Sequence, residues 1–340
     1  MQGFFFVFMT EIRRIIKERI LILDGAMGTM LQKYGFGEKE FRGELFKDHP
    51  GELRGNLDLL SLTQPKAIEE IHRSYLEAGA DIIETNTFSS TTIAMADYNL
   101  ESMVYRLNFE SASIARKTAD EYTRRDPLKP RFVAGSMGPT NKTASISPDV
   151  NNPGYRAVDF ETLRTAYKQQ AEALIDGGVD LLLVETVFDT LNAKAALFAI
   201  EQIKEERGLD IPVMLSGTIT DNSGRTLSGQ TVEAFLISVS HFPLFSIGLN
   251  CALGADQLRT YIRRLSVATD FNISAHPNAG LPNPFGEYDQ SPQMMRDILQ
   301  SYLEEGLINI VGGCCVTTPE HIKAIAEMES KYKPRKSSQH

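Results

Sequence analysis

The sequence predicts a single (β/α)8 barrel, in which eight parallel strands are each followed by a helix. Short aliphatic or β-branched runs recur along the 340 residues, and helical patterns follow them. These runs are nearly continuous in apolar residues, as expected for strands that are covered on both faces. The eight predicted strands are Ile20–Asp24, Ala80–Thr87, Phe132–Ser136, Asp180–Thr186, Val213–Thr218, Phe245–Asn250, Phe271–Ala275 and Ile308–Gly312.

The segments between the predicted strands have the periodicity of amphipathic helices. In Pro65–Ala78 and in Phe160–Ile175, apolar residues recur at helical spacing. A doubly wound open sheet is the alternative architecture. That fold normally carries a glycine-rich dinucleotide fingerprint after the first strand, and the segment 24–29 lacks the GxGxxG spacing. The barrel is therefore favoured.

We expect three regions: an N-terminal extension and helix at 1–19, the barrel at 20–328, and a tail or interdomain linker at 329–340. The apolar run Phe4–Met9 is too short to span a bilayer, and no basic residue precedes it as in a signal peptide. A net charge of −9 and the absence of a basic stripe exclude a typical nucleic-acid surface. We therefore expect a cytoplasmic protein with neither nucleic acid nor membrane as a partner.

Three cysteines are an odd number, and two of them are adjacent, which makes a disulfide framework improbable. Cys251 follows the sixth predicted strand, and Cys314 and Cys315 follow the eighth. Strands of like parity contribute to the same layer of a barrel, so the three thiols can converge. Three thiolates suit a catalytic zinc ion with one open position. The alternative is a set of inert, buried thiols.

Residues near the cysteines fit the same interpretation. The doublet Gly312-Gly313 allows close backbone approach and unusual conformations before the adjacent thiols. Asn278 can lend an amide oxygen to the metal while no substrate is bound, or it can cap the turn after the seventh strand. His276 also follows that strand directly, but a lone histidine is more often structural than a ligand or base.

A second group of polar residues suits an α-amino acid. Asp24 and Glu185 lie at strand ends and can hold a substrate ammonium group, whereas the backbone N–H groups of Ala26, Met27 and Gly28 can hold a carboxylate. The alternatives are a helix N-cap for Asp24 and a strand-end ion pair for Glu185. Further substrate-binding candidates at strand ends are Glu84, Asn86 and Asn250.

Two segments interrupt the regular alternation of strands and helices. Gly35–Leu57 is polar and rich in glycine, and Thr140–Asp159 is a long loop after the third strand. Both follow the carboxyl end of a strand, where barrel enzymes keep their chemistry, so we interpret them as binding loops or lids.

The motifs at these positions resemble those of the homocysteine S-methyltransferases. They are 23–29 (LDGAMGT), 84–88 (ETNTF), 184–186 (VET), 248–251 (GLNC) and 312–315 (GGCC). The resemblance extends from about Ile20 to Ala326. The sequence is most similar to the homocysteine-binding domain of the cobalamin-dependent methionine synthases, and the stretch 136–142 (SMGPTNK) also looks like those enzymes.

The resemblance implies a barrel in which Cys251, Cys314 and Cys315 hold zinc, with the sulfur of homocysteine as fourth ligand. It also implies that the region of Asp24 and Glu185 holds the amino-acid end of the substrate. The methyl donor would then be methylcobalamin on a separate domain, and the partners would be cobalamin-binding and methyltetrahydrofolate-binding domains of the same or another chain. The chain is too short to contain those domains itself.

Three alternatives remain at this stage. The first is a stand-alone homocysteine S-methyltransferase that uses S-methylmethionine or betaine. The second is a zinc-binding barrel that serves as a scaffold without catalysis. The third is a barrel that binds phosphate through Gly312-Gly313 and holds no stoichiometric metal.

Overall fold

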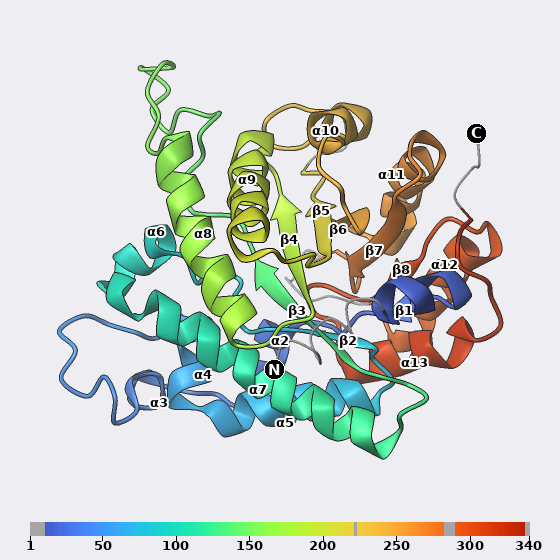
Figure 1. The fold of residues 1–340 in the computed structure, drawn as a ribbon, viewed down its shortest axis with the longest axis horizontal. Coiled ribbons are helices and arrows are strands. Elements are labelled where there is room, and N and C mark those ends of the chain that lie inside the picture. Colours follow the sequence, from blue (N-terminus) through green and yellow to red (C-terminus); the bar gives the residue numbers. More distant parts are fainter. Residues whose placement is uncertain (1–10, 221–222, 282–289, 337–340) are drawn as a thin grey trace.

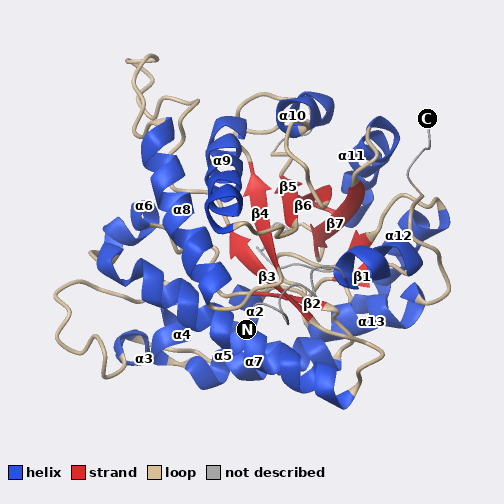
Figure 2. Cartoon of the chain, in the orientation of Figure 1, coloured by secondary structure: helices blue, strands red, loops and turns tan. Residues whose placement is uncertain are grey.

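A computed structural model describes residues 11–220, 223–281 and 290–336 of the chain. One sheet contains eight strands in the order β1-β8-β7-β6-β5-β4-β3-β2, and its neighbouring strands are parallel (Figures 1 and 2). A parallel bridge between Leu23 and Ile82 joins the two ends of this order, which closes the ring. The strands are β1 (Leu21–Ile22), β2 (Ile82–Glu84), β3 (Phe132–Met137), β4 (Leu181–Val187), β5 (Val213–Gly217), β6 (Ser246–Gly254), β7 (Asn272–Asn278) and β8 (Ile310–Val311).

Helices lie outside the strands and complete the predicted (β/α)8 barrel (Figure 2). They are α2 (Met27–Gln32), α3 (Glu38–Arg42), η1 (Leu57–Leu59), α4 (Leu60–Thr63), α5 (Pro65–Glu77), α6 (Thr92–Met95), η2 (Ala96–Tyr98), η3 (Glu101–Met103), α7 (Val104–Arg125), α8 (Phe160–Asp176), α9 (Thr190–Arg207), α10 (Val232–Val239), α11 (Ala255–Ala268), α12 (Pro292–Glu304) and α13 (Pro319–Glu329).

Two predicted strands end more than one residue later than the sequence indicated. β6 continues to Gly254 rather than Asn250, and β7 continues to Asn278 rather than Ala275. The pairing of β6 with β7 changes register between Asn250 and Gly254. Such a bulge inserts extra residues into a strand without ending its pairing, and aliphatic periodicity does not reveal it.

The alternation of side chains along each strand divides the apolar residues into two cores. One core fills the barrel and contains Leu21, Phe132, Leu181 and Met214. The other lies between the sheet and the surrounding helices, and contains the intervening residues, such as Leu182. Because successive side chains point to opposite faces of a strand, this division fixes which later residues face the barrel axis.

A helical segment at 11–18 contributes to the core inside the barrel. Its residues Ile12, Ile15 and Ile16 are at most 5% exposed and belong to the same apolar cluster as Leu21, the first residue of β1, and Phe245, which directly precedes β6. This part of the predicted extension therefore covers the end of the barrel opposite the carboxyl ends of the strands. The apolar run Phe4–Met9 lies outside the described residues.

The chain after α13 is held against the same end of the barrel. The Arg335 side chain is 8% exposed, and its guanidinium group donates to the carbonyl oxygens of Ser266, Thr269 and Phe271. The backbone N–H of Arg335 also donates to the carbonyl oxygen of Ile308. The predicted tail is thus anchored through Arg335 to Ile308, which lies next to the amino end of β8.

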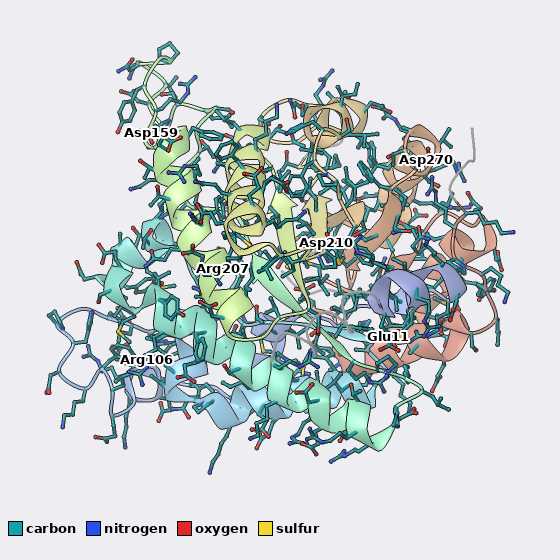
Figure 3. All side chains as sticks on the ribbon, in the orientation of Figure 1. Glu11, Arg106, Asp159, Arg207, Asp210 and Asp270 are labelled. Atoms are coloured by element: carbon teal, nitrogen blue, oxygen red, sulfur yellow. The ribbon has the colours of Figure 1, made fainter. Side chains whose placement is uncertain are left out.

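Charged side chains lie mostly at the periphery, as the labelled residues Arg106, Asp159 and Asp270 show (Figure 3). Within the part of the chain that the structure describes, no helix combines the length and the apolar character needed to cross a bilayer.

Stability should depend on pH through His72 in α5. This imidazole is fully buried, neither ring nitrogen has a hydrogen-bond partner among the described residues, and burial lowers its pKa to about 4. Between pH 6.5 and 4 the unfolded chain binds a proton that the folded protein excludes. The free energy of unfolding should therefore fall by up to about 3 kcal/mol as the pH decreases through this window.

The His72→Leu variant should lose this part of the pH dependence, which urea unfolding at pH 7 and at pH 4.5 measures. His241→Leu removes an exposed histidine and is the matched control. A pH dependence in His72→Leu equal to that of the unsubstituted protein would refute the role of His72.

Candidate active site

A layer of polar side chains lies inside the barrel, near the carboxyl ends of the strands. Its members share the strand parity of apolar residues that fill the barrel: Glu84 follows Ile82, Ser136 follows Ala134, and Glu185 follows Leu183. The same alternation places Ser216, Asn250 and His276 on the inner face of β5, β6 and β7. Polar groups thus converge at the mouth of the barrel.

Two of these strands bulge where they carry functional residues. The pairing of β4 with β5 changes register between Val184 and Val187, and Thr186 has a φ of 56°. In β6, Cys251 and Ala252 have φ values of 55° and 52°. Left-handed conformations are unfavourable for residues with a side chain, so other contacts must hold them. Each bulge redirects the chain next to the barrel axis.

The three cysteines meet at the mouth. Their sulfur atoms all lie within 4.8 Å of one another, and the Sγ atoms of Cys251 and Cys315 are 3.5 Å apart. Thiolates around one tetrahedral zinc ion have their sulfur atoms about 3.8 Å apart. The cysteine triad therefore fits a zinc ion with small adjustments, and it leaves one tetrahedral position for another ligand.

The glycine doublet before Cys314 is required by close packing. A Cβ atom on Gly312 would lie 2.7 Å from the carbonyl oxygen of Leu23, and one on Gly313 would lie 2.4 Å from Cγ2 of Thr317. The prediction of close backbone approach is therefore confirmed. The left-handed conformations, however, occur at Cys251 and at Val316 (φ 66°) rather than at the doublet.

The sulfur atoms interact strongly with one another. Hydrogen bonds from the thiols of Cys314 and Cys315 lower the pKa of Cys251 to about 3. The same interactions raise the pKa of Cys314 well above its ordinary value, and the bond to Cys251 raises the pKa of Cys315 to about 11. The triad by itself thus holds one negative charge, and a cation is needed for all three thiols to ionise.

Asn278 lies beside the triad at the end of β7. The backbone N–H of Cys314 donates to the carbonyl oxygen of Pro277, and that of Ala279 donates to the carbonyl oxygen of Cys315. These bonds hold the β7 end against the cysteine loop. The side-chain Oδ1 of Asn278 is buried without a hydrogen-bond partner among the described residues, which is compatible with the predicted role as a ligand.

Three carboxyl groups lie on the other side of the mouth. Asp24 and Glu185 are 2% and 4% exposed. An oxygen of Asp24 accepts a hydrogen bond from the backbone N–H of Glu84 (3.1 Å), and the Ser136 hydroxyl donates to Glu185. Asp24 does not cap α2, which begins after Ala26, and no ion pair is formed by Glu185 among the described residues.

Burial raises the pKa of all three carboxyl groups. The pKa values of Asp24 and Glu84 lie well above the ordinary value, and that of Glu185 is about 7. Repulsion by Glu185 raises the first two further. The carboxyl cluster therefore retains protons until a cation enters it, and a substrate ammonium group would supply that charge.

Asn250 connects the carboxyl cluster with the cysteine triad. This side chain is completely buried. Its Oδ1 accepts hydrogen bonds from the backbone N–H of Thr186 (3.1 Å) and from the Ser216 hydroxyl (2.6 Å). Its Nδ2 donates to the Thr186 hydroxyl (2.8 Å) and to Sγ of Cys314 (3.7 Å). Asn250 thus positions Thr186 and Cys314, and its contact with substrate stays a prediction.

The structure shows contacts for two of the remaining substrate-binding candidates, Asn86 and Ala26. Asn86 donates from its amide to the carbonyl oxygen of Leu57 and the hydroxyl of Ser61, so it anchors the loop after β1. The backbone N–H of Ala26 donates to the carbonyl and hydroxyl oxygens of Thr317. The N–H groups of Met27 and Gly28, in the first turn of α2, remain the predicted carboxylate donors.

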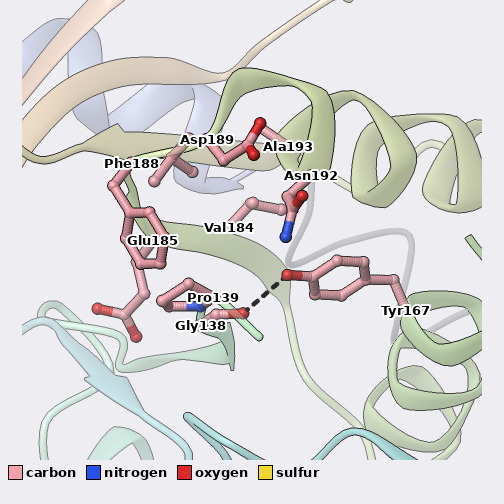
Figure 4. Close-up of a pocket in the computed structure, with 10 residues that line it drawn as sticks. Gly138, Pro139, Tyr167, Val184, Glu185, Phe188, Asp189, Asn192 and Ala193 are labelled. Carbon is pink, nitrogen blue, oxygen red and sulfur yellow. Dashed lines mark hydrogen bonds between the residues drawn. The ribbon is translucent and has the colours of Figure 1, made fainter. Parts of the chain in front are cut away.

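The loop at 140–159 protrudes beside α8 (upper left of Figure 1) and is tied to the barrel near a small pocket. Asp189 accepts hydrogen bonds from the backbone and hydroxyl of Ser145, and Asn192 accepts one from the backbone of Ala144. Figure 4 shows the pocket next to Glu185, where the Tyr167 hydroxyl donates to the carbonyl oxygen of Gly138. The base of this loop is thus part of the mouth.

Sequence reasoning underestimated His276 and Ser136. His276 is 1% exposed, and a ring nitrogen lies within 4.8 Å of carboxylate oxygens of Glu84 and Glu185. The signal that could have found these residues is strand parity, because each occupies an inward position of its strand.

Solved structures with a similar fold include the homocysteine methyltransferase MmuM from Escherichia coli. Its metallated form matches with a TM-score of 0.71 and 24% identity, over 92% of this chain and 96% of that chain. Its apo form matches with a TM-score of 0.66 and 24% identity over the same shares. These likenesses support the barrel fold.

The sequence model of the homocysteine S-methyltransferase family matches residues 21–328, which include the whole strand ring and the three cysteines. The chain therefore belongs to the homocysteine S-methyltransferase family and is a methyltransferase.

Proposed function

We propose that this protein uses zinc to activate the thiol of homocysteine, which then accepts a methyl group to give methionine. The observation that carries this proposal is the position of the cysteine triad beside a buried carboxyl cluster in one barrel mouth. A thiol-binding metal site and an ammonium-binding site in the same barrel mouth suit a short amino acid with a terminal sulfur.

Cys251, Cys314 and Cys315 would hold the metal, and Asn278 would donate its amide oxygen while no substrate is bound. A metallated form is known for the homocysteine methyltransferase from E. coli, which supports a metal in this family. When bound, zinc would lower the pKa of the substrate thiol, so that its sulfur is a nucleophilic thiolate at neutral pH.

The other residues bind and orient the substrate. Glu185, with Asp24 and Glu84 beside it, would hold the ammonium group, and the N–H groups of Met27 and Gly28 would receive the carboxylate. The Ser136 hydroxyl donates a hydrogen bond that orients the carboxyl group of Glu185. Asn250 would keep Cys314 and the Glu185–Thr186 bulge at a constant separation.

For the methyl donor we propose methylcobalamin, carried by a separate domain of the same or a partner chain. The stretch 136–142 resembles the methionine synthases, and in the structure it connects β3 with the loop at the mouth. Homocysteine and the donor would then meet at the exposed side of the triad, where Cys315 is the most accessible of the three cysteines.

A second candidate is a stand-alone homocysteine S-methyltransferase that uses S-methylmethionine or betaine. One observation favours it. The match covers 96% of the chain of the E. coli homocysteine methyltransferase, which leaves no room in that matched chain for a further domain.

The donor assay separates these candidates. Purified protein loaded with zinc is offered homocysteine with methylcobalamin, S-methylmethionine or betaine, and methionine is quantified by mass spectrometry. We expect methionine with methylcobalamin at a rate at least about tenfold above the other donors. Turnover confined to S-methylmethionine or betaine would establish the stand-alone enzyme instead.

Substitution of one metal ligand tests the triad. Cys314→Ser should lose the zinc ion of the cysteine triad together with methyl transfer, because a neutral hydroxyl replaces a thiolate. Metal analysis and circular dichroism measure the two effects, and the barrel should remain folded. Full activity of a metal-free Cys314→Ser protein would contradict the proposal.

Substitution in the carboxyl cluster tests the ammonium site. Glu185→Gln should raise the Kd for homocysteine at least about tenfold, because a neutral amide replaces the carboxylate that pairs with ammonium. The zinc held by the cysteine triad should remain unchanged, and Glu161→Gln, which alters an exposed carboxylate on α8, is the matched control. Calorimetric titration with an unaltered Kd would remove Glu185 from the ammonium site.

A further inference from the structure

The carboxyl cluster and His276 form a second set of groups with the chemistry of metal ligands. One carboxylate oxygen of Glu84, one of Glu185 and one ring nitrogen of His276 all lie within 4.8 Å of one another. These residues come from β2, β4 and β7, so the set spans the interior of the barrel. It shares no residue with the cysteine triad.

Their positions follow from the barrel itself. Each of the three residues occupies an inward position of its strand, and each follows by two residues another inward side chain: Ile82, Leu183 or Ser274. The set is therefore held by backbone geometry rather than by flexible loops, and rigid elements position ligands more precisely than loops do.

The set has unsatisfied binding capacity. His276 is 1% exposed, and its Nε2 atom has no hydrogen-bond partner among the described residues. The nearby Asp24 is 2% exposed, and its Oδ1 is likewise buried without a partner. A buried nitrogen acceptor or donor and a buried carboxylate oxygen both lose free energy when left unpaired, so a ligand that contacts them gains it.

The ligand types define the cation. One imidazole and two carboxylates are donors that zinc accepts, with metal–ligand distances of about 2.0–2.2 Å, so the ligand atoms around one tetrahedral ion are about 3.4 Å apart. The observed spacing reaches this value with shifts of less than about 1 Å, which side-chain rotation provides. Mg²⁺ and Ca²⁺ prefer sites made of oxygen alone.

We propose that Glu84, Glu185 and His276 form a second divalent-cation site, of the zinc class, which overlaps the ammonium site of the substrate. A cation at this site neutralises the carboxyl cluster and occupies the place of the substrate ammonium group. Excess zinc would therefore inhibit the enzyme by competition with the amino end of homocysteine. The overlap rests on the proposed function, whereas the second site itself does not.

Cobalt(II) serves as the probe, because its absorption differs between the two sites. The full chain without an affinity tag is stripped of metal, titrated with Co²⁺, and monitored by absorption and by metal analysis after gel filtration. The cysteine triad gives intense thiolate-to-metal bands in the near ultraviolet, whereas an oxygen and nitrogen site gives only weak visible bands. We expect two Co²⁺ per chain, only one of which produces the thiolate bands.

Two variants test the assignment. His276→Asn and Glu84→Gln should each lose the second Co²⁺, or weaken it at least about tenfold, and retain the thiolate bands. His241→Asn, which alters an exposed histidine, is the matched control and should bind two. If His276→Asn fails to fold, Glu84→Gln decides, because the amide preserves size and shape.

A second titration tests the overlap. Homoserine carries the ammonium group of homocysteine but no thiol, so it should displace the second Co²⁺ without changing the thiolate bands. If homoserine does not displace the second Co²⁺, the proposed ammonium site is refuted, whereas the second metal site remains supported. One Co²⁺ per unsubstituted chain, or a second Co²⁺ that survives both substitutions, would overturn the proposal.

Discussion

Asn250 forms four hydrogen bonds from the inside of the barrel, and the geometry of the mouth depends on them. Two go to Thr186, at the bulge of β4, and one goes to Cys314 beyond β8. Because a completely buried amide loses free energy for each bond it fails to make, these contacts oppose relaxation of the left-handed Thr186. One side chain thus fixes the distance between the carboxyl cluster and the cysteine triad.

The two clusters present related electrostatic problems. Three thiols in contact hold one negative charge, and the carboxyl groups of Asp24, Glu84 and Glu185 all have raised pKa values. In both places, cations would allow the remaining groups to ionise. The mouth is therefore suited to a ligand that brings a positive charge to one end and a metal-binding sulfur to the other. The same property makes the carboxyl cluster receptive to metal.

The sequence was sufficient for the barrel and for the meeting of the cysteines. Aliphatic runs locate the strands, and the even parity of β6 and β8 brings Cys251 near Cys314. It was insufficient for the bulges, because their left-handed residues Thr186 and Cys251 are neither glycine nor asparagine. Because the bulges were not predicted, the hydrogen bonds of Asn250 could not be predicted either. The contacts of Asn86 could not be foreseen either, because its partners Leu57 and Ser61 belong to the segment between β1 and β2, whose path no periodicity describes.

The anchoring of Arg335 has a consequence for how other domains can be attached. Its bonds to Phe271 and Ile308 place this part of the chain at the amino ends of β7 and β8, on the side away from the mouth. A domain tethered beyond this point would be attached at the end of the barrel opposite the mouth. To deliver a methyl group, its tether would have to run the full height of the barrel wall. The linker length would then set the effective concentration of the donor at the mouth.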